Sequence, residues 1–121
     1  MKEIRLHEGE LNIMELLWSN KVLAAKDIAK IIKEYIGWEK NTTYTVIKRL
    51  INKGVVIREE PGFLCRAAVT KHSVQCEETK ALLNKFYGGS LLNFFNDYLR
   101  TQDLSLEERA TLDQIISGQK F

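Results

Sequence analysis

The chain of 121 residues is long enough for one domain, or for a small domain with an appendage. With 45% hydrophobic and 28% charged residues it is globular in composition, and its two cysteines are too few for a secreted disulfide framework. Charged residues interrupt the start before any signal-peptide core forms, and no apolar run is long enough to span a membrane. We therefore expect a cytoplasmic protein without a membrane partner.

The net charge of +2 is too small to indicate a nucleic-acid partner, but the charges are unevenly distributed. Residues 38–58 contain five basic residues and one acid, whereas residues 101–121 contain two basic and four acidic residues. This asymmetry is typical of a chain whose two ends have different roles.

The N-terminal part predicts two amphipathic helices separated by a short strand. Apolar residues recur at helical spacing over 9–18 and over 26–35, and the pair at 22–23 is compatible with a two-residue strand. The side chains expected to face inward are Leu11, Met14, Leu17, Trp18, Ile28, Ile31, Ile32 and Tyr35.

A third helix is predicted over 40–53, with Gly54 as its end. Its buried stripe consists of Thr43, Val46, Ile47 and Leu50. Two strands, 55–60 and 63–69, then flank the turn residues Pro61–Gly62 and predict a hairpin. The order helix, strand, helix, helix, hairpin is that of a winged helix-turn-helix, in which the third helix enters a major groove of DNA.

The outer face of this third helix is basic, carries Thr, Asn and Tyr, and has no acid. Thr can contact a thymine methyl group or a phosphate, Asn can pair with an adenine edge, and Lys48 and Arg49 suit phosphates. Arg49 has an alternative role, in which it braces the first helix through Glu10 or Glu15. With the wing at 58–66 following the DNA backbone, the predicted DNA contacts are Lys40, Asn41, Thr42, Tyr44, Thr45, Lys48, Arg49, Arg58 and Arg66.

The C-terminal part predicts helices over 71–87, 90–99 and from a capping box at Ser105 to Ile116, with a break at Gly88–Gly89. They carry more apolar surface than such short helices can bury alone, and a second copy of the chain is the simplest cover. The predicted dimerisation residues are Leu82, Phe86, Leu91, Leu92, Phe94, Phe95, Tyr98, Leu99, Leu112, Ile115 and Ile116. The predicted fold is thus mainly α with a small β-hairpin, with a DNA-binding domain over 1–70 and a helical dimerisation region over 71–121.

Several stretches match one pattern in order along nearly the whole chain. They are "GELNIMELLW" (9–18), Trp38, "T-x-x-T-x-x-x-R-L" from Thr42 to Leu50, "KG" (53–54), "LLNFF" (91–95) and "DLS" (103–105). This pattern resembles the penicillinase-repressor family, the BlaI/MecI-type regulators of beta-lactamase and methicillin-resistance genes. The resemblance implies a homodimeric winged-helix repressor that binds a palindromic DNA operator. It also implies relief of repression by a signal-activated protease that cleaves the bond Asn93–Phe94.

The start of the third helix departs from this family pattern. Family members usually have Ser or Thr followed by Pro there, whereas this chain has Glu39–Lys40. Glu is a weak N-cap, which leaves Asn41 as an alternative start. Trp18 and Trp38 each end an apolar run, so we interpret them as core residues and not as stacking platforms for single strands.

Three other kinds of function are compatible with a small domain of this composition. The first is a metal-responsive repressor of the same fold, with a metal site formed by Cys65, His72 and Cys76. A structural zinc site needs a fourth ligand, so we interpret these residues as a small buried thiol and a surface histidine. No nucleophile-elbow or metalloprotease spacing occurs, so we expect neither an enzyme nor a cofactor. A winged helix that binds only proteins is the remaining alternative, and the basic face of the third helix argues against it.

Overall fold

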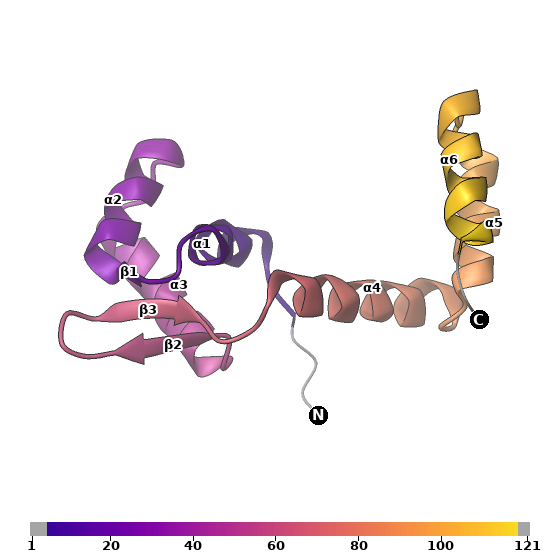
Figure 1. The fold of residues 1–121 in the computed structure, drawn as a ribbon. Helices are drawn as coiled ribbons and strands as arrows, with labels where there is room; N and C mark the ends of the chain where they lie inside the picture. The colour runs from indigo at the N-terminus through magenta and orange to yellow at the C-terminus, as the bar shows by residue number, and fades with distance from the viewer. Residues whose placement is uncertain (1–4, 119–121) are drawn as a thin grey trace. The chain divides into compact units, whose positions relative to one another are not determined.

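The computed structural model describes residues 5–118, which form two compact units that divide between Thr79 and Lys80. Nine helices and strands follow one another in the described range, and the strands form one three-stranded antiparallel sheet (Figure 1). The sheet belongs to the first unit, and the second unit is helical. Within residues 5–118 no helix has both the length and the apolar character that crossing a membrane requires.

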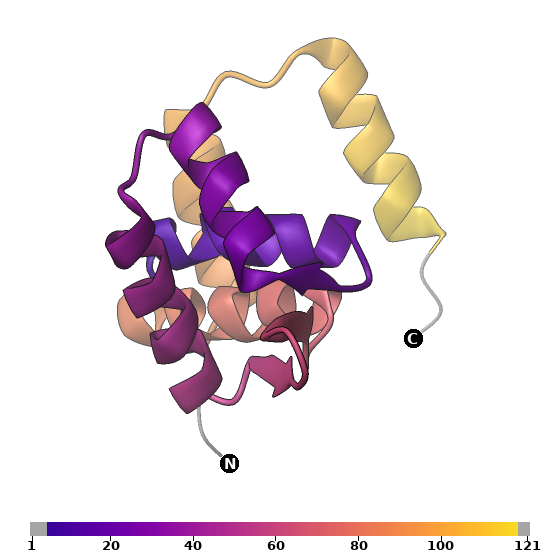
Figure 2. The ribbon, with the colours of Figure 1, turned by 90° about the vertical axis from the view of Figure 1, so that its left-hand side faces the viewer.

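Four elements build the N-terminal part: α1 (Glu8–Ser19), β1 (Leu23–Ala24), α2 (Ala25–Tyr35) and α3 (Lys40–Asn52). Figure 2 shows α2 crossing in front of α1. The helices agree with the prediction to within one residue at each end. The short strand lies one residue later than predicted, because the pairing of β1 with β3 fixes its register.

The wing is the hairpin of β2 (Val56–Glu59) and β3 (Leu64–Ala67). Both strands are shorter than predicted, because residues 60–63 form the loop that joins them. Gly62 has a φ of 95°, a left-handed conformation that glycine adopts without steric cost. β3 is the central strand and pairs with β2 on one side and β1 on the other.

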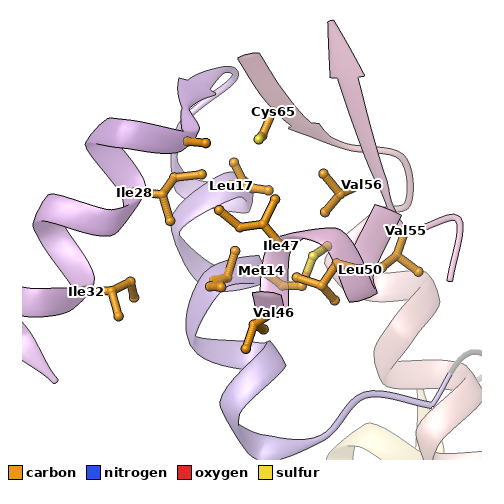
Figure 3. Packing of buried hydrophobic residues seen from close by; sticks show 12 residues of the cluster. Met14, Leu17, Ile28, Ile32, Val46, Ile47, Leu50, Val55, Val56 and Cys65 are labelled. Atoms are coloured by element: carbon orange, nitrogen blue, oxygen red, sulfur yellow. The ribbon is translucent and has the colours of Figure 1, made fainter. Parts of the chain in front are cut away.

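The core of the first unit lies where α1, α2, α3 and the sheet meet, and Figure 3 shows their side chains converging. The predicted stripe of α3 is confirmed, since all four of its members are buried. Of the other predicted inward residues, Leu11, Trp18 and Ile31 are half-buried, and Tyr35 was placed wrongly because it is 79% exposed. Tyr35 is the last residue of α2, where the helix has passed the core. Ile13, which the prediction omitted, is fully buried.

Both tryptophans pack against this core, as predicted. The indole Nε1 of Trp18 donates a hydrogen bond of 2.9 Å to the carbonyl of Val69. The ring of Trp38 lies over Gly9, where an added Cβ would come within 3.2 Å of the ring. Trp38 thereby fixes the chain between α2 and α3 against α1.

The remaining helices are α4 (Lys71–Tyr87), α5 (Leu91–Thr101) and α6 (Leu106–Ser117). Gly88 and Gly89 both have positive φ angles and end α4, as predicted. The capping box of α6 is present, with Ser105 and Glu108 as its two side chains. The division between the two units falls inside α4, so the first compact unit extends past residue 70, where the prediction ended the first domain.

Candidate nucleic-acid interface

The exposed face of α3 presents the predicted base-reading residues to solvent. Asn41, Thr42, Thr45, Lys48 and Arg49 are all exposed, while the opposite face of the helix forms part of the core. Within residues 5–118, Lys48 and Arg49 make no ion pair. This face therefore combines two uncompensated positive charges with short polar side chains.

Other α3 side chains already have contacts within the protein. The hydroxyl of Thr45 donates a hydrogen bond of 2.9 Å to the carbonyl of Asn41, one turn earlier. Tyr44 is half-buried and packs edge to face on Phe63 of the wing loop, with 5.8 Å between ring centroids. The ammonium group of Lys40 lies 5.7 Å from the ring centre of Tyr44. Tyr44 thus links α3 to the wing.

The N-terminus of α3 is at the first of the two predicted starts. The helix begins at Lys40 and not at Asn41, with Glu39 as the N-cap. The carbonyl of Glu39 accepts hydrogen bonds from Thr42 and Thr43, although its side chain makes no capping bond. The carboxylate of Glu39 lies 3.6 Å from Lys33 of α2.

The two wing arginines are paired with neighbouring acids. Arg58 lies 2.6 Å from Glu60 and stacks over the ring of Phe63 at 3.5 Å, and Arg66 lies 2.7 Å from Glu59. The register also sets them on opposite faces of the hairpin, because Arg58 pairs across from Cys65 and Arg66 is the residue after Cys65. This charge balance was not predicted, although Glu59 and Glu60 directly follow Arg58 in the chain.

Arg49 does not brace the first helix; Lys53 does. The ammonium group of Lys53 lies 2.7 Å from Glu10, whose side chain is 1% exposed, and it also donates to the carbonyl of Arg5. Burial raises the pKa of Glu10, but the hydrogen bond from the backbone of His7 and the contact with Lys53 outweigh it and hold that pKa below its ordinary value. Glu15, the other acid considered, pairs with Lys71 of α4.

A row of lysines on α2 was missed by the sequence analysis. Lys26, Lys30 and Lys33 are spaced four and three residues apart, and they line one hollow together with Lys40 of α3. The spacing alone could have revealed this row, because residues three and four apart share a helix face.

The three candidate metal ligands do not form one site, because Cys65 lies apart from the other two. Cys65 is fully buried in the core of the wing, and burial raises the pKa of its thiol. His72 and Cys76 are exposed neighbours on α4, with 3.5 Å between the ring nitrogen and the sulfur. In the part of the chain that the structure describes, no three His, Cys, Asp or Glu side chains are grouped so as to hold a metal ion.

The predicted dimerisation residues, all in the second unit, are largely uncovered. Phe94 and Leu112 are half-buried and the other nine are exposed, and neither α5 nor α6 contains a buried residue. α5 and α6 enclose a groove of about 520 Å³. Its apolar lining consists of Leu92, Phe95, Leu99, Leu104, Leu106, Leu112 and Ile116, and its polar lining of Gln102, Asp103, Arg109 and Asp113.

The bond between Asn93 and Phe94 lies in the first turn of α5. The hydroxyl of Ser90 accepts a hydrogen bond of 3.0 Å from the amide of Asn93, and its carbonyl accepts one of 3.2 Å from Phe94. The ring of Phe94 stacks on Tyr98 at 5.6 Å and meets Tyr87 edge to face at 5.4 Å. This bond is thus held in a capped helical turn.

Comparison with known proteins decides the family. The model of the family described as "Penicillinase repressor" matches residues 6–118. The chain belongs to the penicillinase repressor family. The match spans all the helices and strands of the structure, which agrees with the resemblance drawn from the sequence motifs.

Other members of the penicillinase repressor family are similar over nearly their whole length. The penicillinase repressor of Bacillus licheniformis is 27% identical over 123 residues, which cover 99% of this chain and 96% of that protein. The penicillinase repressor of Staphylococcus aureus is 24% identical over 118 residues, covering 96% of this chain and 94% of that one. The methicillin resistance regulatory protein MecI of Mammaliicoccus sciuri is 25% identical over 118 residues, with 96% of both chains covered.

Two solved structures share the fold. The DNA binding domain of the repressor BlaI superimposes with a TM-score of 0.54 at 22% identity and covers 58% of this chain and 88% of that one. The complex structure of hsRosR-S4 superimposes with a TM-score of 0.53 at 18% identity and covers 93% of this chain and 87% of that one. These likenesses, with the order of helices and strands, confirm the predicted winged helix-turn-helix.

Proposed function

We propose that this protein is a transcriptional repressor that binds double-stranded DNA through the exposed face of α3. The observation that carries the proposal is the composition of that face: Asn41 and Thr42 offer short polar side chains, while Lys48 and Arg49 offer charges that no acid among the described residues neutralises. Side chains of this length allow the helix backbone to approach the floor of a major groove. Membership of the penicillinase repressor family supports the same function.

We further propose that the protein acts as a homodimer joined through its second unit. The nine exposed apolar side chains of the predicted dimerisation residues, on α4, α5 and α6, are costly to leave in water. In a two-fold dimer the same patch meets itself, so it must carry no large charge of one sign. The α5–α6 groove satisfies this condition, because its lining has one base, Arg109, and two acids, Asp103 and Asp113, which leaves a small net charge. Two DNA-reading helices in one dimer suit a palindromic operator.

Repression is relieved, in this proposal, by cleavage of the bond Asn93–Phe94 by a signal-activated protease. The cut would separate α4 from most of α5 and from α6, and so divide the proposed dimer surface. Each large apolar side chain lost from an interface removes about 1.5–3 kcal/mol of burial. Cleavage would therefore dissociate the dimer without any contact to DNA.

The DNA-reading role of α3 is tested by comparing Thr42→Ala with Lys48→Ala. Thr42→Ala should lower discrimination at one or two base positions by roughly 1–3 kcal/mol, because Thr42 reads a base edge. Lys48→Ala should weaken binding about equally on all sequences, because a phosphate contact carries no sequence information. The measurement is a competition shift assay between a duplex of the protein's own promoter and single-base variants of it. If both variants lose the same affinity on every duplex, α3 does not read the sequence.

A further inference from the structure

The lysine row on α2 and the wing differ in how much positive charge they present. Within residues 5–118, Lys26 and Lys30 are exposed and make no hydrogen bond or ion pair. Lys33 and Lys40 line the same hollow. Among the described residues Asp27 is the one acid in that lining, and Glu39 pairs with Lys33 from outside it, so four ammonium groups are set against two carboxylates.

The wing, in contrast, is close to neutral. Each of its two arginines lies within 2.7 Å of an acid of the same hairpin. To bind a phosphate, Arg58 would have to leave both the carboxylate of Glu60 and the ring of Phe63. Glu59 and Glu60 would also repel the approaching backbone. An arginine that must first leave a carboxylate therefore gains less binding free energy from a phosphate than a lysine that faces only water.

The lysine row is continuous with the proposed DNA-reading helix. Lys40 is the first residue of α3 and also lines the hollow formed with α2. In a helix-turn-helix, the helix before the recognition helix crosses the DNA backbone when the recognition helix lies in the groove. The DNA strand that borders the groove holding α3 would therefore pass next to α2.

We propose that Lys26, Lys30 and Lys33 of α2, with Lys40, form the main phosphate-binding surface of this repressor, and that the wing arginines contribute little. The inference rests on the proposed function, since it assigns which part of the DNA-binding unit contacts the backbone. It revises the expectation that the wing follows the backbone through Arg58 and Arg66. The ligand is the phosphodiester backbone of duplex DNA, independent of its base sequence.

The test compares three double variants that each remove two positive charges. Lys26→Gln with Lys30→Gln alters the row, Arg58→Gln with Arg66→Gln alters the wing, and Lys85→Gln with Arg100→Gln is the control in the second unit. Affinity is measured by fluorescence anisotropy on a promoter duplex and on a mixed-sequence duplex, over a series of salt concentrations. Circular dichroism and sedimentation show that each variant keeps its fold and its oligomeric state.

The row variant should lose about tenfold or more in affinity on both duplexes. The slope of log K against log salt concentration should fall by about 0.9 for each phosphate contact removed. The wing variant should lose less than half as much slope, and the control should match the wild type. A wing variant that loses as much slope as the row variant would overturn the inference, as would a row variant that behaves like the control.

A variant that is expected to gain affinity gives a second test, because misfolding could not produce a gain. Asp27→Asn removes the carboxylate that lines the hollow and should tighten binding to both duplexes by about twofold, the effect expected of one screened charge near a phosphate. Unchanged or weaker binding by this variant counts against a phosphate in the hollow. Wild-type protein that binds neither duplex would overturn the proposed function itself, whereas wild-type binding with an unaffected row variant overturns only this inference.

Discussion

The pair formed by Glu10 and Lys53 is the most deeply buried charge contact among the described residues. Glu10 belongs to α1 and Lys53 follows the last residue of α3, so the pair joins the two helices at the end of the DNA-reading helix. The side chain of Lys53 is 30% exposed, which lets its ammonium group keep part of its hydration. The pair thus fixes α3 on α1 without the full cost of burying two charges.

Lys53→Gln should lower the free energy of unfolding by roughly 2 kcal/mol at pH 7, because it leaves the Glu10 carboxylate buried without its charge partner. In the wild type the pKa of Glu10 lies below its ordinary value of 4.5, so the ionised carboxylate stabilises the fold above that pH, and this is lost on acidification. In the variant, burial raises the pKa, and protonation relieves the buried charge. The stability deficit should therefore shrink between pH 7 and pH 4.

Urea unfolding of wild type and variant at both pH values measures this deficit. Lys48→Gln is the matched control, since Lys48 lies on the same helix but is exposed and unpaired in the described part of the chain. A deficit that is the same at both pH values, or equal for the two variants, would show that the pair does not stabilise α3.

The sequence could predict the α3 stripe because Thr43, Val46, Ile47 and Leu50 share one face at helical spacing. It could not choose between Arg49 and Lys53 as the brace to Glu10. The two residues are four positions apart, so they point in similar directions, and only the packing of α1 on α3 decides which one reaches the acid.

The start of α5 is the element on which the proposed proteolytic switch depends. Proteolysis of a folded region proceeds through local opening, so the rate of cleavage follows the population of the opened state. Ser90 opposes this opening by accepting hydrogen bonds from the first turn, through its hydroxyl and its carbonyl. The aromatic contacts of Phe94 oppose it as well.

Ser90→Ala should raise the rate of cleavage at the start of α5 by about fivefold, because losing an N-cap costs about 1 kcal/mol. Limited proteolysis with chymotrypsin, which cuts after aromatic residues such as Phe94, measures this opening when followed by mass spectrometry. Ser105→Ala is the matched control, since Ser105 caps α6 in the same way. If Ser90→Ala leaves the rate of cleavage unchanged, or if Ser105→Ala accelerates the same cleavage, the Ser90 cap does not limit the opening of α5.

Element boundaries were predictable where a residue type marks them. Ser105 and Gly88–Gly89 mark helix ends through capping and positive φ angles, and the structure agrees. The two-residue strand β1 has no pattern of its own, and its pairing with β3 determines it. Likewise, nothing in the sequence of α4 marks the division after Thr79, since the helix continues without interruption.

The whole molecule consists of two compact units, so the proposed DNA binding and dimerisation should be separable by truncation. A chain that ends at Gly88 retains the first unit, including its entire core and the N-terminal part of α4. It loses α5 and α6, which carry most of the proposed dimer surface. The truncated chain should unfold cooperatively in thermal circular dichroism and sediment as a monomer. Truncated protein that still dimerises would show that the interface lies outside α5 and α6.

Whether this chain reads DNA as a dimer is decided by two quantities together, the number of chains bound per duplex and the preference for the promoter sequence. Intact protein is titrated into a labelled duplex of its own promoter and into a shuffled duplex of equal length, with sedimentation of the complexes to give the number of chains bound. A repressor that reads DNA as a dimer should bind as two chains per promoter duplex, in one step and in preference to the shuffled sequence. Equal affinity for both duplexes, or a single chain at saturation on the promoter, would contradict it.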